Sequence, residues 1–267
     1  MKIHHLKAYI KVWLKLTTQQ FQSQIGNNRA AAVLFIFGKL FRLATALMLV
    51  YVVVGKAKLL VGYNLSEAIF ILVLFNLIQT ITQLFMRGVY MFRQKVVDGT
   101  FDFYLLNPLS ELFYSLFTYT DALDIIVLIP YIGLTFWSWS ATSYPITLLT
   151  VLILMLVILL SFIMVMAWHI FIIAIGVRYL EVDNTIMLYR DLERMAAMPV
   201  EIYGKFGSAF LTYIFPFALM ATIPARVVFG LYDPWYLLIF AVLSIAQLRL
   251  ALWFWHHSLL HYSSASS

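Results

Sequence analysis

Residues 97–109 read VDGTFDFYLLNPL and lie between two long apolar segments of the chain. Asp98 or Thr100 can cap a short helix here, and Gly99 eases the turn that precedes it. The helix is predicted to end at Asn107, because the residue before a proline avoids the α region. Bulky apolar side chains in a connecting segment need a surface that covers them. We expect four of them to be exposed: Phe101, Phe103, Tyr104 and Leu105.

The composition around this segment is that of a membrane protein. Of the 267 residues, 63% are hydrophobic and 11% are charged, which is more apolar than a soluble core of this size needs. Several apolar runs reach roughly 20 residues, the length that crosses a bilayer. The runs are unbroken rather than alternating, which excludes a β-barrel and leaves helices as the spanning structure. We therefore predict a single-domain, all-α, multi-pass membrane protein.

Hydropathy places six transmembrane helices along the chain, at about residues 30–54, 66–86, 121–139, 145–177, 208–229 and 235–255. The transmembrane region, 30–257, follows an N-terminal segment, 1–29, and precedes a short polar tail, 258–267. Basic residues gather before span one and after spans two and four, which predicts that both termini and the 97–109 loop are cytoplasmic. No cleavable signal peptide is visible at the N-terminus.

The N-terminal segment has the pattern of an amphipathic interfacial helix. Lys7, Lys11 and Lys15 repeat every four residues beside an apolar face that includes Trp13. A helix of this kind lies in the headgroup region of membrane lipid, with its lysines on anionic phosphates. The alternative is a solvated helix that packs on the cytoplasmic end of the protein itself.

Polar residues inside the predicted spans mark internal surfaces. Asn76, Gln79 and Gln83 form one stripe on span two, which can line a translocation path or hydrogen-bond to other helices. Lys39 and Arg42 lie one turn apart in span one. They can touch a transported substrate, snorkel to the interface, or form a structural pair.

The titratable residues give little support for catalysis. Asp121 and Asp124 open span three, where acidic groups favour the helix dipole. They can also pair with the basic residues after span two, which are Arg87, Arg93 and Lys95. His169 stands alone in an apolar run and is expected to be structural. No catalytic or metal site is predicted.

The region 178–230 allows two interpretations, one from hydropathy, which follows here, and one from the family resemblance described next. Its first part, 178–198, is rich in charged residues and strongly amphipathic. Hydropathy alone favours a helix on the cytoplasmic surface for this part, followed by span five at about 208–229.

Segment 98–109 fits the pattern Asp-Gly-x-Phe-Asp-x-x-Leu-Leu-x-Pro-Leu and resembles the cytoplasmic loop of ABC-2-type transporter permeases. The likeness is greatest to a six-span bacterial group without a fused ATPase domain. A weaker likeness follows in the right order, with PVEIY at 199–203, FPF at 215–217 and IPA at 223–225. In this family, the equivalent of 182–198 would be a polar fifth span and 199–230 an outer re-entrant element.

The resemblance implies that the loop 97–109 holds a coupling helix that docks on a separate ATP-binding cassette (ABC) ATPase. The residues implied in coupling are Asp98, Gly99, Phe101, Asp102, Leu105, Leu106 and Pro108. Asp102 would meet a basic residue of the ATPase, and the apolar side chains would fill a groove. The chain has no P-loop, so ATP and Mg would bind the partner and no cofactor is expected on this chain.

The resemblance therefore implies the permease subunit of an ABC exporter in the bacterial inner membrane, which forms its translocation path with a second permease, identical or paralogous. An ion-coupled secondary carrier is the alternative, although no internal repeat is evident. An intramembrane enzyme is disfavoured because the chain lacks cysteine, a His-Glu-x-x-His motif and a serine-histidine pairing of the protease type. The net charge is +6, but the basic residues that carry it flank apolar runs, so no nucleic-acid partner is expected.

Overall fold

The computed structural model describes residues 2–57, 60–180, 182–215, 217–231 and 234–263. Over these residues the protein is helical and has no strands, which confirms the predicted all-α class. Four helices are long and apolar enough to cross a membrane. They are α2 (Arg29–Ala57), α3 (Leu65–Met86), α8 (Leu148–Tyr179) and α12 (Pro234–Leu259). A shorter apolar helix, α7 (Asp124–Ser140), covers the predicted third span.

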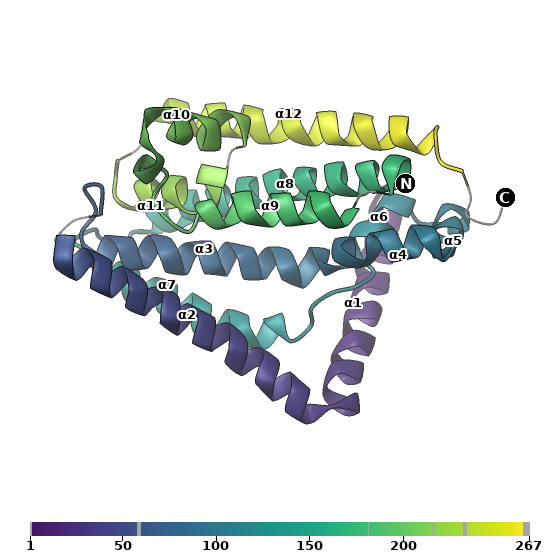
Figure 1. The fold of residues 1–267 in the computed structure, drawn as a ribbon, viewed down its shortest axis with the longest axis horizontal. Coiled ribbons are helices and arrows are strands. Elements are labelled where there is room, and N and C mark those ends of the chain that lie inside the picture. Colours follow the sequence, from purple (N-terminus) through teal and green to yellow (C-terminus); the bar gives the residue numbers. More distant parts are fainter. Residues whose placement is uncertain (1, 58–59, 181, 216, 232–233, 264–267) are drawn as a thin grey trace.

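Helix α3 is the centre of the bundle. It packs against α2, α7 and α8, and most of its side chains are buried, whereas α2 and α12 bury few of theirs (Figure 1). A capping box starts α3: Asn64 Oδ1 accepts from the Glu67 backbone N–H at 3.0 Å, and Glu67 Oε2 accepts from the Asn64 N–H at 2.8 Å. The large exposed apolar surfaces of α2 and α12 are those expected of helices that face lipid or another chain.

Short elements gather at one end of the bundle, after α3. They are η1 (Arg87–Met91), α4 (Phe92–Val97), α5 (Thr100–Leu106) and α6 (Glu111–Phe117). We call this the α5 end. Helix α1 (Lys2–Asn27) runs across the direction of α3, α8 and α12 and reaches the α5 end (Figure 1).

The predicted fifth span at 208–229 is wrong as a single helix. The chain here is broken into α10 (Gly204–Ala209), a π-helical turn η3 (Phe210–Ile214), η4 (Phe217–Met220) and α11 (Thr222–Val228). Gly204 has φ of +69° and Gly230 has φ of +64°, a backbone region that glycine enters without strain. These pieces, with η2 (Val200–Tyr203), pack at the end opposite α5, which we call the far end (Figure 1).

Hydropathy suggested that 178–198 is a helix on the cytoplasmic surface, apart from the bundle. Helix α9 (Val182–Met195) instead packs on the bundle. It lies along α8, and Val182, Ile186, Tyr189 and Glu193 form its buried face. A polar helix followed by a broken segment agrees in order with the other interpretation of 178–230. That 182–198 is a fifth span and 199–230 an outer re-entrant element stays a prediction. Hydropathy misjudged α9 because its charges, except Glu193, stay on the outer face, while the apolar inner face is too short to raise the average.

Candidate functional site

Helix α5 begins and ends where its local sequence requires. Gly99 precedes it with φ of +75°, and Asp98 Oδ1 accepts from the Thr100 backbone N–H at 2.9 Å. Hydrogen bonds from Thr100 hold the pKa of the Asp98 carboxyl below its usual range. Asn107 is extended, with ψ of 151°, as expected before Pro108.

The inner face of α5 is a buried aromatic cluster. Phe101 is fully buried and its ring lies 5.3 Å from Phe92, 6.1 Å from Trp255 and 5.0 Å from Tyr262. Tyr104 is also buried. The expectation that these two side chains are exposed is therefore wrong. They lie three residues apart on a helix and so share one face, and that face is turned to the bundle.

The outer face of α5 is apolar and exposed. Phe103 is 68% exposed and Leu106 is 82% exposed, and Leu105 and the preceding Val97 are exposed beside them. We call these four residues the α5 patch. Among the coupling residues implied by the resemblance, Asp98, Leu105, Leu106 and Pro108 are on the outside, whereas Phe101 is an anchor. Phe103 was absent from that set. Its spacing of two residues from Phe101 was the signal for two faces, because residues two apart on a helix do not face the same way.

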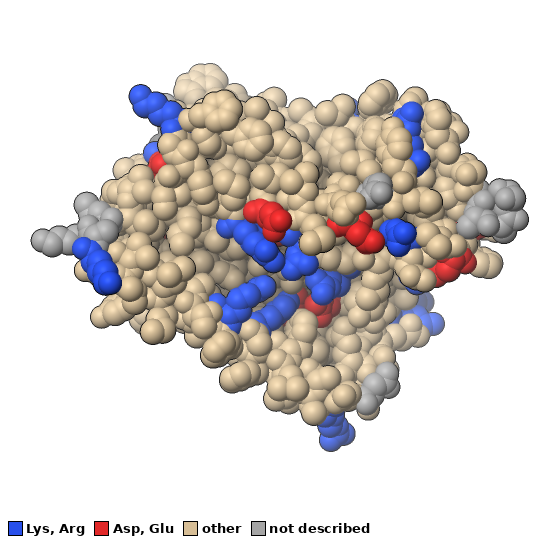
Figure 2. Space-filling view, in the orientation of Figure 1, with Lys and Arg blue, Asp and Glu red and all other residues tan. Residues whose placement is uncertain are grey.

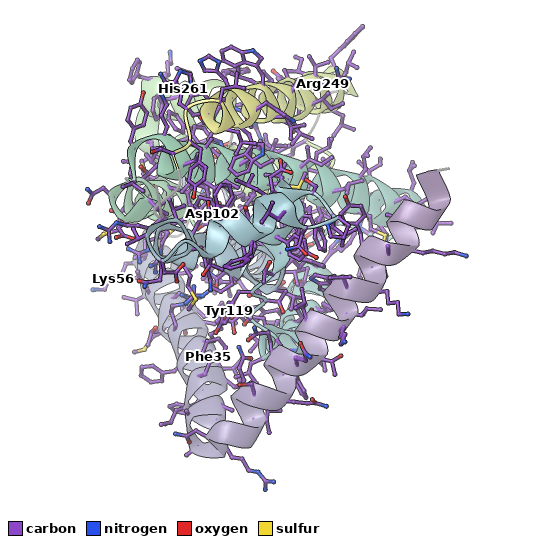
Figure 3. All side chains as sticks on the ribbon, turned by 90° about the vertical axis from the view of Figure 1, so that its right-hand side faces the viewer. Phe35, Lys56, Asp102, Tyr119, Arg249 and His261 are labelled. Atoms are coloured by element: carbon purple, nitrogen blue, oxygen red, sulfur yellow. The ribbon has the colours of Figure 1, made fainter. Side chains whose placement is uncertain are left out.

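The C-terminal end of α12 holds α5 in place. The Tyr262 hydroxyl donates to Asp102 Oδ1 at 2.7 Å, and Trp255 Nε1 donates to Glu111 Oε1 on α6 at 3.1 Å. Burial and the Asp102 carboxylate raise the pKa of Tyr262 to about 12, so the hydroxyl keeps its proton. Figure 3 shows Asp102 on α5 at this end of the molecule. Asp102 thus has a partner within the chain, in the segment predicted to be a simple polar tail.

One face of helix α1 packs on the rest of the protein, and another face is exposed. Trp13 stacks on Phe85 at 5.0 Å between ring centroids, and Tyr9 accepts from the Ser110 backbone N–H at 3.1 Å. Trp13 is therefore a packing residue rather than a membrane-surface residue. An apolar stripe remains exposed next to the three exposed lysines; it consists of Leu6, Ile10 and Leu14. The membrane-surface role of Lys7, Lys11 and Lys15 stays a prediction.

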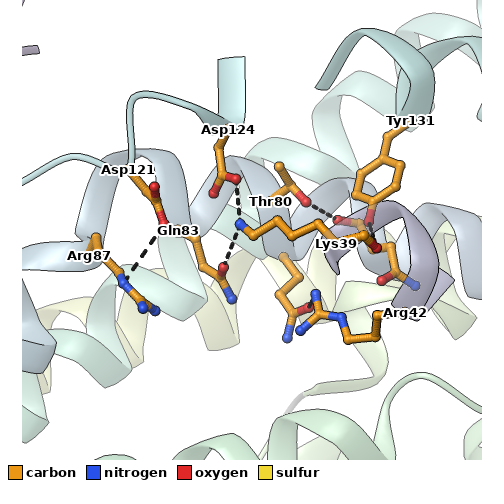
Figure 4. A network of polar contacts seen from close by, with 10 residues as sticks. Lys39, Arg42, Thr80, Gln83, Arg87, Asp121, Asp124 and Tyr131 are labelled. Atoms are coloured by element: carbon orange, nitrogen blue, oxygen red, sulfur yellow. Dashed lines mark hydrogen bonds and ion pairs between the residues drawn. The ribbon is translucent and has the colours of Figure 1, made fainter. Parts of the chain in front are cut away.

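A polar network crosses the middle of the bundle (Figure 4). Lys39 on α2 forms an ion pair with Asp124 on α7, and Lys39 Nζ donates to Gln83 Oε1 on α3 at 3.1 Å. The Lys39 side chain is 11% exposed and the Asp124 side chain is fully buried. These contacts agree with the structural pair that the sequence left open for Lys39. Arg87 Nε lies 3.9 Å from Asp121 Oδ2, the pairing anticipated after span two.

The network continues through Gln79 to α9. Arg42 donates to Gln79 Oε1 at 3.4 Å, and Gln79 Nε2 donates to Glu193 Oε2 at 3.3 Å. Tyr189 also donates to Glu193, at 3.4 Å. Gln79 and Gln83 are thus engaged between helices, as interhelical hydrogen bonding predicts. The third member of the predicted stripe, Asn76, instead donates to the carbonyl of residue 72 on its own helix.

His169 is buried in α8. Its Nδ1 lies 2.9 Å from the Val165 carbonyl oxygen, and its ring packs edge-on against Tyr189 at 4.9 Å. These contacts are those of a structural histidine. Across the described residues, no group of three or more histidine, aspartate or glutamate side chains is placed to hold a metal ion.

Charged side chains gather in the middle of one face of the molecule, over α9, α3 and α2 (Figure 2). The charged residues of these helices that are exposed or half-buried include Arg42 on α2 and Arg190, Asp191 and Arg194 on α9. We call this surface the central charged band. Charges at this depth of a membrane bundle are costly against hydrocarbon, so the band requires protein or water next to it.

A family model described as an ABC-2 family transporter protein matches residues 40–266, which is most of the chain. The comparisons with curated proteins and with solved structures gave no match.

Proposed function

This chain belongs to the ABC-2 transporter family, and from this premise we propose that it is the permease of an ABC exporter driven by an ATPase on a separate polypeptide. Membership of the family makes the chain a membrane transport subunit, not itself a catalyst. ATP and Mg would bind the partner. We place the protein in a bacterial inner membrane, with the α5 end and both termini on the cytoplasmic side.

The observation that carries this proposal is the α5 patch. Phe103, Leu105 and Leu106 project from a short helix that is anchored from behind by Phe101 and Tyr104. A rigid helix with an uncovered apolar face at the end of a membrane bundle has the form of a docking element for another protein. The ATPase is the partner that the family supplies.

The orientation is supported by the distribution of basic residues. Those in and near η1 and α4 are Arg87, Arg93 and Lys95, all at the α5 end, as is α1 with its lysines. Lys205 belongs to α10 at the far end, which this orientation would place on the outer side. The remaining excess of basic residues at the α5 end still favours a cytoplasmic position for the α5 end.

A second permease chain, identical or paralogous, would cover the central charged band. Its α9, α3 and α2 surfaces would meet those of this chain, and the translocation path would lie between the two. Nucleotide-driven closure of the ATPase would push on α5. Because α5 packs on α6 and, through Phe101 and Trp255, on α12, the push would move α12 as well as α3 and shift the population between inward-open and outward-open states.

The test is a detergent pull-down of ABC ATPases from the membranes of the cells that make this permease. The wild type should retain the ATPase, and Phe103→Ala/Leu106→Ala should lose at least about ten-fold of the binding, because two exposed apolar anchors are removed. The matched control is Phe206→Ala/Leu231→Ala, which removes two exposed apolar side chains at the far end. Equal loss with the control pair would refute the assignment of the docking surface. Failure of the wild type to bind in every nucleotide state would remove the permease-with-separate-ATPase proposal.

A further inference from the structure

The far end contains a cavity of about 270 Å³ between α10, η3, α11 and the start of α12. Its walls carry three charged side chains from different elements, Glu201 on η2, Lys205 on α10 and Arg226 on α11. Four hydroxyl-bearing residues also line it: Ser208, Thr212, Tyr213 and Tyr236. The cavity is therefore built to hold a polar, charged group, and it lies at the opposite end of the bundle from the α5 patch (Figure 1).

The ion pair in its wall is incompletely satisfied. Arg226 Nε lies 3.6 Å from Glu201 Oε1, beyond the range of about 2.7–3.2 Å for a hydrogen bond of this type. Arg226 Nε and Glu201 Oε2 are both buried, and neither has a hydrogen-bond partner among the described residues. Tyr63 donates to Glu201 Oε1 at 3.4 Å, a long contact. Both charged groups thus retain hydrogen-bonding capacity, which a bound group with a donor and an acceptor would use.

Exposed aromatic side chains surround the cavity. Tyr213, Trp235 and Tyr236 are exposed beside it, and Phe206 projects from the same element as Lys205. Tyrosine and tryptophan concentrate at the level of lipid headgroups, because their rings are apolar while their N–H and O–H groups stay wet. This indicates that the cavity opens at headgroup depth. The opposite side of α12 carries an exposed apolar face that includes Leu238 and Val242.

We propose that the cavity binds the head group of an amphiphile that carries an oxyanion together with a primary ammonium, as phosphoethanolamine does. Arg226 and Lys205 hold the oxyanion, since guanidinium and ammonium donors match phosphate oxygens. Glu201 accepts from the ligand ammonium. The apolar tail extends from the cavity into the surrounding lipid. This binding site goes beyond the permease function and does not require the ATPase or transport.

The experiment titrates the detergent-purified full chain with mixed micelles and counts bound lipid by native mass spectrometry. Three diacyl lipids with the same tails separate the charges of the head group: phosphatidylethanolamine has oxyanion and ammonium, phosphatidylcholine lacks ammonium donors, and phosphatidylglycerol lacks the cation. We expect phosphatidylethanolamine to bind at least about ten-fold more tightly than phosphatidylcholine, because one charge-assisted hydrogen bond contributes that much. Binding of phosphatidylcholine or phosphatidylglycerol as tightly as phosphatidylethanolamine would overturn the proposal.

Single variants test which charged side chain of the cavity binds which group of the lipid head group. Lys205→Gln and Arg226→Gln should weaken binding of all three lipids, whereas Glu201→Gln should abolish only the preference for ethanolamine. Lys205 is exposed, so its replacement tests the proposal even where Arg226→Gln fails to fold. The matched control is Arg249→Gln, which removes an exposed cation of α12 outside the cavity. Equal loss with the control would mean general electrostatic attraction and would overturn the site.

Water-soluble O-phosphoethanolamine separates two sources of this chemistry. If it displaces the lipid, the cavity recognises the head group as a free solute. If only the diacyl form binds, the ligand is an amphiphile from the bilayer.

Discussion

Lys39 carries a positive charge into the middle of a membrane bundle, where an isolated ammonium group is expensive. The cost is offset by partners on two other helices, since Asp124 comes from α7 and Gln83 from α3. A buried ion pair adds little net stability compared with an apolar pair, but removal of one partner leaves the other charge uncompensated. Lys39 and Asp124 therefore fix how α2 and α7 sit on α3.

We expect Lys39→Met to destabilise the protein by about 3 kcal/mol or more, because the buried Asp124 carboxylate loses its partner. The double variant Lys39→Met/Asp124→Leu should recover most of this loss, because neither charge is then left unpaired. Thermal unfolding in detergent measures both. The control is Arg194→Gln, which breaks the exposed Arg194–Asp191 pair and should change stability by less than about 1 kcal/mol. A double variant as unstable as the single one would contradict a paired role.

At the scale of the element, α5 shows how one short helix holds two functions. Its inner face is continuous with the aromatic core formed by Phe92 and Trp255, and its outer face is uncovered. The two faces differ only by position around the helix, since the side chains that form both of them are largely apolar. Stability and partner binding should therefore respond to different substitutions.

Phe101→Ala is expected to lower the stability of the protein by about 3–5 kcal/mol, because it leaves a cavity under α5. Phe103→Ala should change stability by less than about 0.5 kcal/mol, because its side chain is 68% exposed. Unfolding of the two single variants, measured side by side, provides the comparison. A stable Phe101→Ala variant that has lost ATPase binding would instead support a docking role for Phe101.

Helix α1 makes a second prediction at this scale. A bimane probe on Ile10→Cys should show a blue-shifted emission in nanodiscs that contain anionic lipid, because Ile10 belongs to the exposed apolar stripe beside the lysines. Replacement of Lys7, Lys11 and Lys15 by glutamine should reduce the shift. The chain has no cysteine, so the label is unique, and Gln19→Cys provides an exposed polar control on the same helix. Equal emission at both sites would exclude an interfacial helix.

For the whole molecule, the central charged band distinguishes one face from the rest of the surface (Figure 2). Arg190 lies over the ring of Tyr90 and Arg42 contacts Gln79, but Asp191 and Arg194 are exposed. Lipid tails cannot solvate these charges. A second permease facing α9 would provide the polar surroundings that they need.

Leu188→Cys, on the exposed face of α9, is expected to form cross-linked dimers with a short bismaleimide in membranes. The control is Ile245→Cys, an exposed position on α12, which should remain monomeric under the same conditions. Denaturing gels measure the fraction of dimer. Cross-linking at Ile245→Cys but not at Leu188→Cys would place the interface on the α12 side and contradict the arrangement.

The sequence alone determined the class of the protein and the positions of its long apolar helices. Runs of roughly 20 apolar residues carry that information locally, since a lipid environment demands helices of this length. The bounds of α5 were also local, because Gly99 and Pro108 act through the backbone of their neighbours. The family resemblance in 98–109 was confirmed by the match over residues 40–266.

Only the tertiary structure decided which side of each helix faces inward. Phe101 and Phe103 are chemically identical, and what separates them is the packing of α5 on Trp255 of α12 and on the segment after α12, where Tyr262 contacts Asp102 from 160 positions away. Trp13 faces Phe85 rather than lipid for the same reason. The charges of α9 fit a surface helix equally well. The hydrogen bond from Gln79 on α3 to Glu193 shows that α9 packs on the bundle. Amphipathic patterns show that a helix has two environments, but the identity of each environment depends on contacts between distant parts of the chain.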